Sequence, residues 1–476
     1  MAQIDKPSEY FNTLIWTGDG NATRSFTGVG FRPDWIWVKE RSGTANNNLW
    51  DVIRGLNKIV QTSTTSAEIT DPSSGYLSSY DSDGFSVQAG SSSTDNFNEN
   101  STTYAAWNWR AAGTAPSKTY AVTVVSDSGN KYRFDGYGTS AVTLEISEGG
   151  TFRFDQSDSS NSGHPLRFST TSDGTHGGGS EYTTGVTTNG TPGSAGAYTE
   201  ITVAASAPTL YYYCSVHSGM GGQANTPTTN SFSNFDGSIQ SNISPNSTSL
   251  FSIVTYTGTG SAATIGHGLG VAPACIIFKT RNTTSDWFVY HQSTGATNRT
   301  KLNQTVASSA STFIDDTAPS STVFNTEGGG ATGTNGNTYV AYCFAEKKGF
   351  SKFGSYTGNG DSSGNGPFIY TGFKPAFIIT KRYTASTTGS WLMYDTKRDV
   401  SNLTTKKLFA NENGQENLST DPSGVDESNN NIDIYSNGFK QKEDYTFSNG
   451  DGDTYLYIAF AEQPLVGTNN IPTTAR

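Results

Sequence analysis

The chain has 476 residues, of which 15% are charged and 33% are apolar, and its formal net charge is −11. A negative chain is poorly suited to neutralise phosphates, so nucleic-acid binding is not expected, and no apolar run reaches the roughly 18 residues that span a bilayer, so membrane insertion is not expected either. The 8 Trp, 24 Tyr and 26 Phe argue against a disordered chain, and the abundant Gly, Ser, Thr and Asn favour short strands joined by turns, which predicts an all-β protein.

The first predicted module covers residues 1–113. It contains IWTGDG from Ile15, GFRPDWIWVKERSG from Gly30 and YAAWNWRA from Tyr104. The Gly-rich segment is typical of a tight turn, because glycine tolerates positive φ. The run from Trp35 to Val38 is apolar at every position, which predicts a central strand covered on both faces. Short strands with frequent turns favour a β-sandwich or jelly-roll-like unit.

A different pattern occupies residues 118–226. TYAVTVVSD, from Thr119, alternates apolar and polar residues as a half-buried strand does. Towards the end of this segment, YYYCSVHSGMGG contains Cys214, His217 and Met220, and His164 lies upstream. Two His and one Cys in a plane, with a weakly bound axial Met, are the ligands of a blue-copper site. The segment therefore carries the residue types of a copper centre.

This segment, with its Cys-x-x-His-x-x-Met loop, resembles the cupredoxin family over most of its length. The resemblance implies a Greek-key β-sandwich between the first and second modules, with His164, Cys214, His217 and Met220 as the metal ligands. No redox partner or second centre is visible in the sequence, so a structural clip is favoured over electron transfer. A site inherited without use is the alternative, since metal-free relatives of this fold are common.

The motifs of the first module recur twice downstream of a predicted linker at residues 227–248. TYTGTG from Thr255, GVAPACIIFKTRN from Gly270 and YVAYCFAE from Tyr339 mark a second copy, residues 249–348. SYTGNG from Ser355, GFKPAFIITKRY from Gly372 and YLYIAFAE from Tyr455 mark a third copy, residues 349–476. We therefore expect three tandem β-sandwich modules with the cupredoxin-like domain between copies one and two.

The other conspicuous residues are expected to be structural. Cys275 and Cys343 lie in apolar runs and are predicted to be buried free thiols. His267 is predicted to lie in a turn and His291 at the surface. His176 is predicted to be a loop residue, with an approach to the copper region as the alternative. The pairs Asp81/Asp83, Asp315/Asp316 and Asp451/Asp453 are read as solvated turns, with a calcium site as a minor alternative. Most of the tryptophans are expected in a core or subunit interface, and a few on exposed loops where they could stack on glycans.

The repeated unit with GFRPDWIWVKERSG, and the C-terminal AFAEQPLVGTNNIPTTAR, resemble virion proteins of tailed phages, especially marine cyanophage-like ones. The resemblance implies a tail fibre, spike or tail appendage that attaches to the host surface, assembled in the host cytoplasm and located in the virion. The expected partners are other virion proteins, further copies of this chain (a trimer among the options) and a host-surface glycan. A capsid decoration protein is the alternative, a glycan-degrading enzyme or a copper redox protein ranks lower, and no enzymatic activity is expected.

Overall fold

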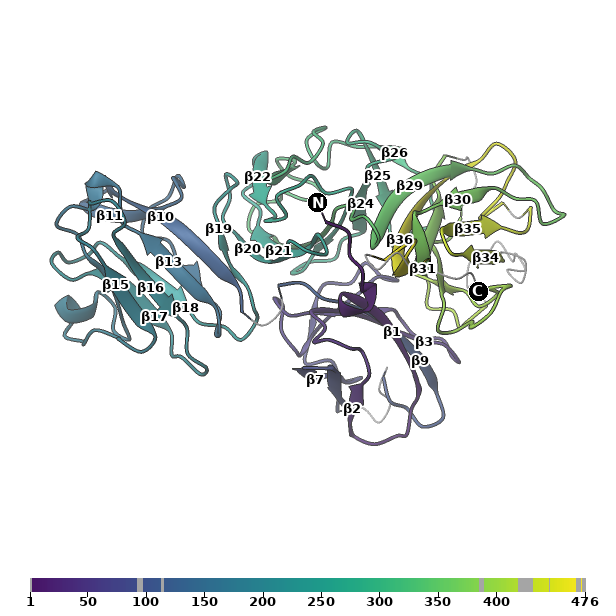
Figure 1. The fold of residues 1–476 in the computed structure, drawn as a ribbon, viewed down its shortest axis with the longest axis horizontal. Coiled ribbons are helices and arrows are strands. Elements are labelled where there is room, and N and C mark those ends of the chain that lie inside the picture. The colour runs from purple at the N-terminus through teal and green to yellow at the C-terminus, as the bar shows by residue number, and fades with distance from the viewer. Residues whose placement is uncertain are drawn as a thin grey trace.

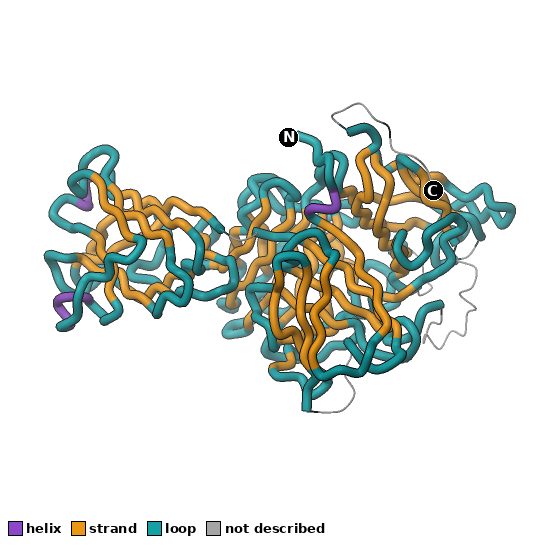
Figure 2. The backbone as a smooth tube through the Cα atoms, turned by 60° about the horizontal axis from the view of Figure 1, so that its bottom comes forward, coloured by secondary structure: helices purple, strands orange, loops and turns teal. Residues whose placement is uncertain are grey.

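The computed structural model describes residues 2–91, 97–112, 115–384, 389–417, 431–444, 446–467 and 472. Strands dominate these residues, and the helical elements are three short 3-10 turns at Pro7–Glu9, Ser159–Asn161 and Gly174–Gly177 (Figure 2). The predicted all-β class is confirmed. Among the described residues no helix has the length and apolar character needed to cross a membrane.

Module 1 consists of a large sheet and a small sheet. The large sheet has the order β1 (Phe11–Thr17), β9 (Thr103–Trp109), β3 (Trp35–Glu40), β4 (Asn48–Asp51), β5 (Lys58–Gln61) and β6 (Ile69–Thr70). The small sheet has the order β2 (Thr23–Thr27), β8 (Gly84–Gln88) and β7 (Tyr76–Asp81). A buried cluster that includes Phe26, Ile36, Trp50 and Phe85 lies between the two sheets, which therefore form a β-sandwich.

The same plan recurs in module 2, with two additional strands at one edge. Its large sheet has the order β19 (Phe232–Asn234), β20 (Ser241–Asn246), β21 (Phe251–Thr257), β28 (Thr338–Phe344), β23 (Cys275–Thr280), β24 (Trp287–His291), β25 (Asn298–Lys301) and β26 (Ser309–Ala310). Its small sheet pairs β22 (Ala263–Gly266) with β27 (Val323–Thr326). The sequence predicts a linker at 227–248, but this segment contributes β19 and β20 to the sheet. Its apolar residues Phe232 and Ile243 are buried.

Module 3 follows the plan a third time. Its large sheet has the order β29 (Ser351–Thr357), β36 (Thr454–Pro464), β31 (Phe373–Arg382), β32 (Leu392–Asp395) and β33 (Leu408–Phe409). Its small sheet has the order β30 (Phe368–Tyr370), β35 (Gly438–Gln441) and β34 (Ile432–Tyr435). In module 1, β9 lies between β1 and β3. In the same way β28 lies between β21 and β23 in module 2, and β36 between β29 and β31 in module 3, a strand order that three copies of one unit would produce.

The three large sheets pack on one another around a single buried core. Its members include Trp35 and Trp109 from module 1, Tyr342 from module 2, and Phe377 and Phe460 from module 3. Figure 1 shows modules 1, 2 and 3 grouped together, with the fourth domain projecting from module 2. Because each module buries its large sheet against the other two, none of them is an independent bead on a string.

The fourth domain, which we call the insert domain, also has two sheets. One has the order β11 (Asn130–Phe134), β10 (Ser117–Ser126), β13 (Thr151–Asp155), β16 (Tyr198–Thr202) and β15 (Val186–Asn189). The other has the order β12 (Leu144–Glu145), β18 (Gly222–Asn225), β17 (Leu210–Cys214) and β14 (Leu166–Ser169). The two sheets share a core containing Phe134, Phe152 and Tyr212, which continues into module 2 through Phe232. The Tyr120 hydroxyl donates to the Ser233 carbonyl at 2.9 Å across this junction.

Candidate metal centre

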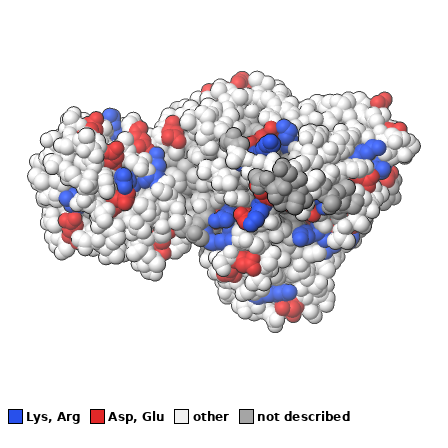
Figure 3. All heavy atoms as spheres, in the orientation of Figure 1, with Lys and Arg blue, Asp and Glu red and all other residues white. Residues whose placement is uncertain are grey.

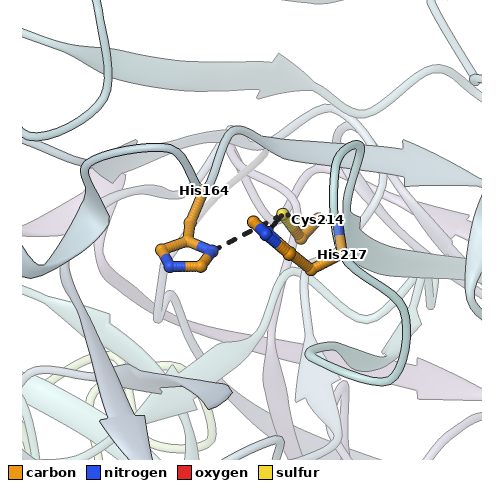
Figure 4. Close-up of side chains that lie close together, drawn as sticks. All are labelled: His164, Cys214 and His217. Carbon is orange, nitrogen blue, oxygen red and sulfur yellow. Dashed lines mark hydrogen bonds between the residues drawn. The ribbon is translucent and has the colours of Figure 1, made fainter.

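The predicted ligands His164, Cys214 and His217 converge at one end of the insert domain (Figure 4). Cys214 is the last residue of β17, and His217 follows in the turn after it. His164 lies two residues before β14, which pairs with β17 so that Leu166 is opposite Cys214. The strand pairing therefore brings together residues that are 50 positions apart in the sequence.

The spacing of the three ligand atoms suits a single transition-metal ion. Cys214 Sγ lies 4.0 Å from His164 Nδ1 and 3.8 Å from His217 Nδ1. With metal–sulfur and metal–nitrogen bonds of about 2.3 and 2.1 Å at a trigonal angle, the sulfur–nitrogen separation would be about 3.8 Å. Cys214 is buried and His217 is exposed. One thiolate and two imidazole nitrogens in this arrangement could accept a metal ion with only small side-chain adjustments.

Met220, the fourth predicted ligand, is 1% exposed and lies in the same domain core as Cys214. It also lines, with His217, a shallow surface hollow whose wall includes His176 and the exposed Val216. Met220 and His217 thus border the same hollow. This placement is compatible with the weak axial role that the sequence predicts.

Hydrogen bonds to the backbone hold the Cys214–Met220 loop in place. Asp173 accepts a hydrogen bond from the Gly219 amide at 2.9 Å, and the Lys131 ammonium donates to the Gly219 carbonyl. His176 Nε2 lies 3.0 Å from the carbonyl oxygen of Cys214. From the sequence His176 is expected to be a loop residue, and only the fold identifies its partner, because no motif links residue 176 to residue 214. These bonds preorganise the ligands without using their coordinating atoms.

The protonation of His164 also favours metal binding. Burial lowers the pKa of the His164 imidazole, and the neighbouring His217 imidazole lowers it further. A lower pKa keeps His164 neutral, which is the form that coordinates a metal. The backbone amide of His217 donates to Cys214 Sγ at 3.4 Å, which helps to fix the position of the sulfur.

The remaining histidines and cysteines are structural. Cys275 and Cys343 are buried free thiols, as predicted, and burial raises the pKa of both. His267 is buried at 0% exposure and accepts the Leu269 amide within its turn. The prediction of a surface position for His291 is wrong: it is also 0% exposed, and its Nε2 lies 3.2 Å from the Tyr457 carbonyl of module 3. The sequence WFVYH could not predict this burial, because His291 is buried by the packing of module 3 on module 2.

None of the eight tryptophans offers an exposed ring, since the most exposed, Trp16, is 8% exposed. The expectation that some stack on glycans is therefore wrong for tryptophan. Three of the acidic residues singled out from the sequence have protein partners instead of open coordination sites. Asp83 accepts from the Gly28 and Gly30 amides, Asp81 accepts from Ser79 and Ser86, and Asp453 pairs with Arg382.

Charged groups on the face shown in Figure 3 form small mixed clusters separated by uncharged surface.

No curated protein and no solved structure matches the chain. A family of unknown function, described as Domain of unknown function (DUF7483), matches residues 6–150 and 223–464. The match covers the three modules and leaves out 151–222, the segment that holds all four predicted ligands. The chain belongs to the DUF7483 family, and within it carries the metal-site segment as a stretch that the family match does not cover.

Proposed function

We propose that the insert domain binds one copper ion through His164, Cys214 and His217, with Met220 as a weak axial ligand. The observation that carries this proposal is the convergence of the Cys214 sulfur and two imidazole nitrogens at separations of 3.8 and 4.0 Å. Bound copper would supply a one-electron centre, but its main effect here would be to clip the segment before β14 to the loop after β17. This structural role agrees with the sequence, which shows no second redox centre.

Copper loading of the purified full chain tests the proposal. We expect one copper per chain by elemental analysis and a thiolate-to-copper absorption band in the visible range. Cys214→Ser should abolish the band, whereas Cys343→Ser, at a buried thiol far from the site in sequence, should leave it unchanged. No copper uptake, or a band that survives in Cys214→Ser, would refute the proposal.

We further propose that the chain is a structural protein of a phage virion, in a tail fibre, spike or tail appendage that attaches to the host surface. Support comes from the resemblance of the repeated motifs and from the architecture, in which three all-β modules share one buried core. Such a body suits a durable particle component, and no enzymatic activity is proposed. Other virion proteins would be its partners, and self-association, including a trimer, remains a prediction.

The alternative position is the capsid surface, where the protein would act as a decoration protein. Gold labelling of purified particles with an antibody to this chain separates the two. Label confined to the tail supports the appendage proposal, and label distributed over the head would replace it with the decoration role.

A further inference from the structure

The small sheet of module 3 carries aromatic side chains on its outer face where the other two modules do not. Phe368 and Tyr370 of β30 are 46% and 57% exposed, whereas Ile369 between them is buried. Ile369 is opposite Phe439, as Phe26 is opposite Phe85 in module 1 and Ile265 is opposite Phe324 in module 2. This inward residue fixes the correspondence of the three sheets.

The correspondence makes the other modules internal controls. Phe368 and Tyr370 occupy the positions of Ser25 and Thr27 in module 1. In module 2 the same two positions are Thr264 and Gly266. The fold is therefore built twice without an aromatic residue at either position. Since exposed aromatic rings contribute little to folding, their presence in module 3 indicates a binding role.

The neighbouring strands extend the aromatic face. Tyr435 of β34 and Tyr370 lie on either side of Gly438 in the strand register. The Phe368 and Tyr435 rings meet edge to face, with centroids 5.7 Å apart. A Cβ at Gly438 would lie 2.1 Å from the Ile369 carbonyl oxygen and 3.0 Å from the Phe368 ring, so close strand pairing requires glycine here, and its lack of a side chain also leaves room for that ring. The three rings define what we call the aromatic face: Phe368, Tyr370 and Tyr435.

Lys440 places a positive charge next to the aromatic face. Lys440 stands between Phe368 and Asp433 in the register, and Asp433 forms an ion pair with Lys442 at 3.1 Å. Among the described residues no hydrogen bond or ion pair engages the Lys440 ammonium. Lys440 also interacts electrostatically with Asp361. A lysine that no hydrogen bond or ion pair holds in place, next to exposed rings, matches a ligand that combines an apolar ring face with a carboxylate.

We propose that the aromatic face and Lys440 bind an acidic glycan, a saccharide whose rings stack on the aromatic side chains and whose carboxylate pairs with Lys440. Sugar rings present C–H groups on one face and hydroxyls at the rim, and so suit a tyrosine that is apolar in its body and polar at its tip. The proposal deepens the attachment role proposed above, because it names the surface and the ligand class, and it rests on that role only for its biological setting.

Titration calorimetry of the full chain with a hexameric oligogalacturonate, and with maltohexaose as the neutral counterpart, tests the proposal. We expect tighter binding of the acidic oligomer. The double variant Phe368→Ser with Tyr370→Thr, which installs the module 1 residues, should weaken it by at least about tenfold. Lys440→Gln should remove the preference for the acidic oligomer. Val306→Ser, at an exposed apolar residue of module 2, is the matched control and should bind as the wild type does.

Three results would overturn the proposal: no binding of the acidic oligomer by the wild type, unchanged affinity in the double variant, or equal preference for both oligomers. Sedimentation of the same samples tests whether a second copy of the chain occupies the aromatic face instead of a glycan. Dimers that dissociate in the double variant would show that the face is a self-association surface instead. Because the assay uses purified protein, its failure would leave the copper proposal and the position on the particle untouched.

Discussion

Glu68→Gln should destabilise the three-module body strongly, because Glu68 joins modules 1 and 2 through a nearly buried ion cluster. Its carboxylate accepts hydrogen bonds from Arg281 of module 2 at 2.9 and 3.1 Å, and it lies 3.4 Å from Arg54 of its own module. The side chain of Glu68 is 9% exposed and that of Arg54 is 0% exposed. Burial raises the pKa of Glu68, but these hydrogen bonds and the nearby guanidinium and ammonium groups outweigh that effect, and its pKa is lowered.

The expected loss follows from that burial. Removing one partner of a buried ion pair costs about 3–5 kcal/mol. Arg54 keeps its pair with Asp51 in the variant, and Arg281 is partly exposed, so we expect about 2–3 kcal/mol here. The control is Glu9→Gln, whose pair with Lys6 is exposed on both sides and should cost less than about 1 kcal/mol.

Tryptophan fluorescence during urea unfolding is the assay, because residues 118–226 contain no Trp and the signal reports the three modules alone. The urea midpoint of Glu68→Gln should fall well below that of Glu9→Gln. Equal midpoints for the two variants would refute the claim that the ion cluster holds modules 1 and 2 together.

Two further predictions concern buried titratable groups. Burial lowers the pKa of Lys381 to about 7 in the folded protein, whereas in the unfolded chain this lysine keeps its proton up to about pH 10.4. Between pH 7 and 8.5 the unfolded state therefore binds more protons than the folded state. The free energy of unfolding should rise with pH in this range, by at most about 1.4 kcal/mol per pH unit. Urea midpoints of the wild type minus those of Lys381→Met should show this rise, and a flat or falling difference would contradict it. Cys275 and Cys343 should resist a thiol reagent in the native protein, because burial raises the pKa of both and shields them. Mass spectrometry after labelling should find them modified only in urea, and rapid native labelling of either would contradict their placement.

Much of the fold could be predicted from the sequence because its signals are local. Short strands, Gly-rich turns and the recurring run that ends at Lys39, Lys279 and Lys381 need no tertiary information. The Cys-x-x-His-x-x-Met spacing is equally local, and it led to His164 through residue type alone. Contacts between modules could not be predicted in this way, which is why His291 was expected at the surface.

The segment 227–248 is a second case in which local sequence did not predict a tertiary contact. Its Ser- and Asn-rich composition is typical of a linker, yet the apolar residues Phe232 and Ile243 pair across two strands and complete the sheet of module 2. Composition describes how a segment behaves in isolation, whereas an available sheet edge can order it. The aromatic face was missed for a similar reason, since only strand register shows that Phe368 and Tyr370 point outward.

The three lysines show how the modules are joined. Each donates to a carbonyl of its own module and to one of another module: Lys39 to Ala45 and Asn413, Lys279 to Ser285 and Thr65, and Lys381 to Gly389 and Thr305. Module 1 thus bonds to module 3, module 2 to module 1, and module 3 to module 2. The bonds therefore close a ring of three modules within one chain.

The three contacts between modules, which we call seams, differ in their charged groups. Arg281 and Glu68 pair at one seam and Arg41 and Glu416 at the second, each Glu also reaching an arginine of its own module. At the third, the Ser308 amide donates to the Tyr383 carbonyl, just as the Glu68 amide donates to that of Arg281. Here Tyr and Ser stand in place of Arg and Glu, and Thr294 stands where the own-module arginine would be. Losing only one charge of such a buried cluster would leave the others unpaired at about 3–5 kcal/mol. The absence of all three charges avoids that penalty. Hydrogen bonds from side chains to backbone carbonyls still join modules 2 and 3, among them Lys381 to Thr305 and Trp391 to Lys301.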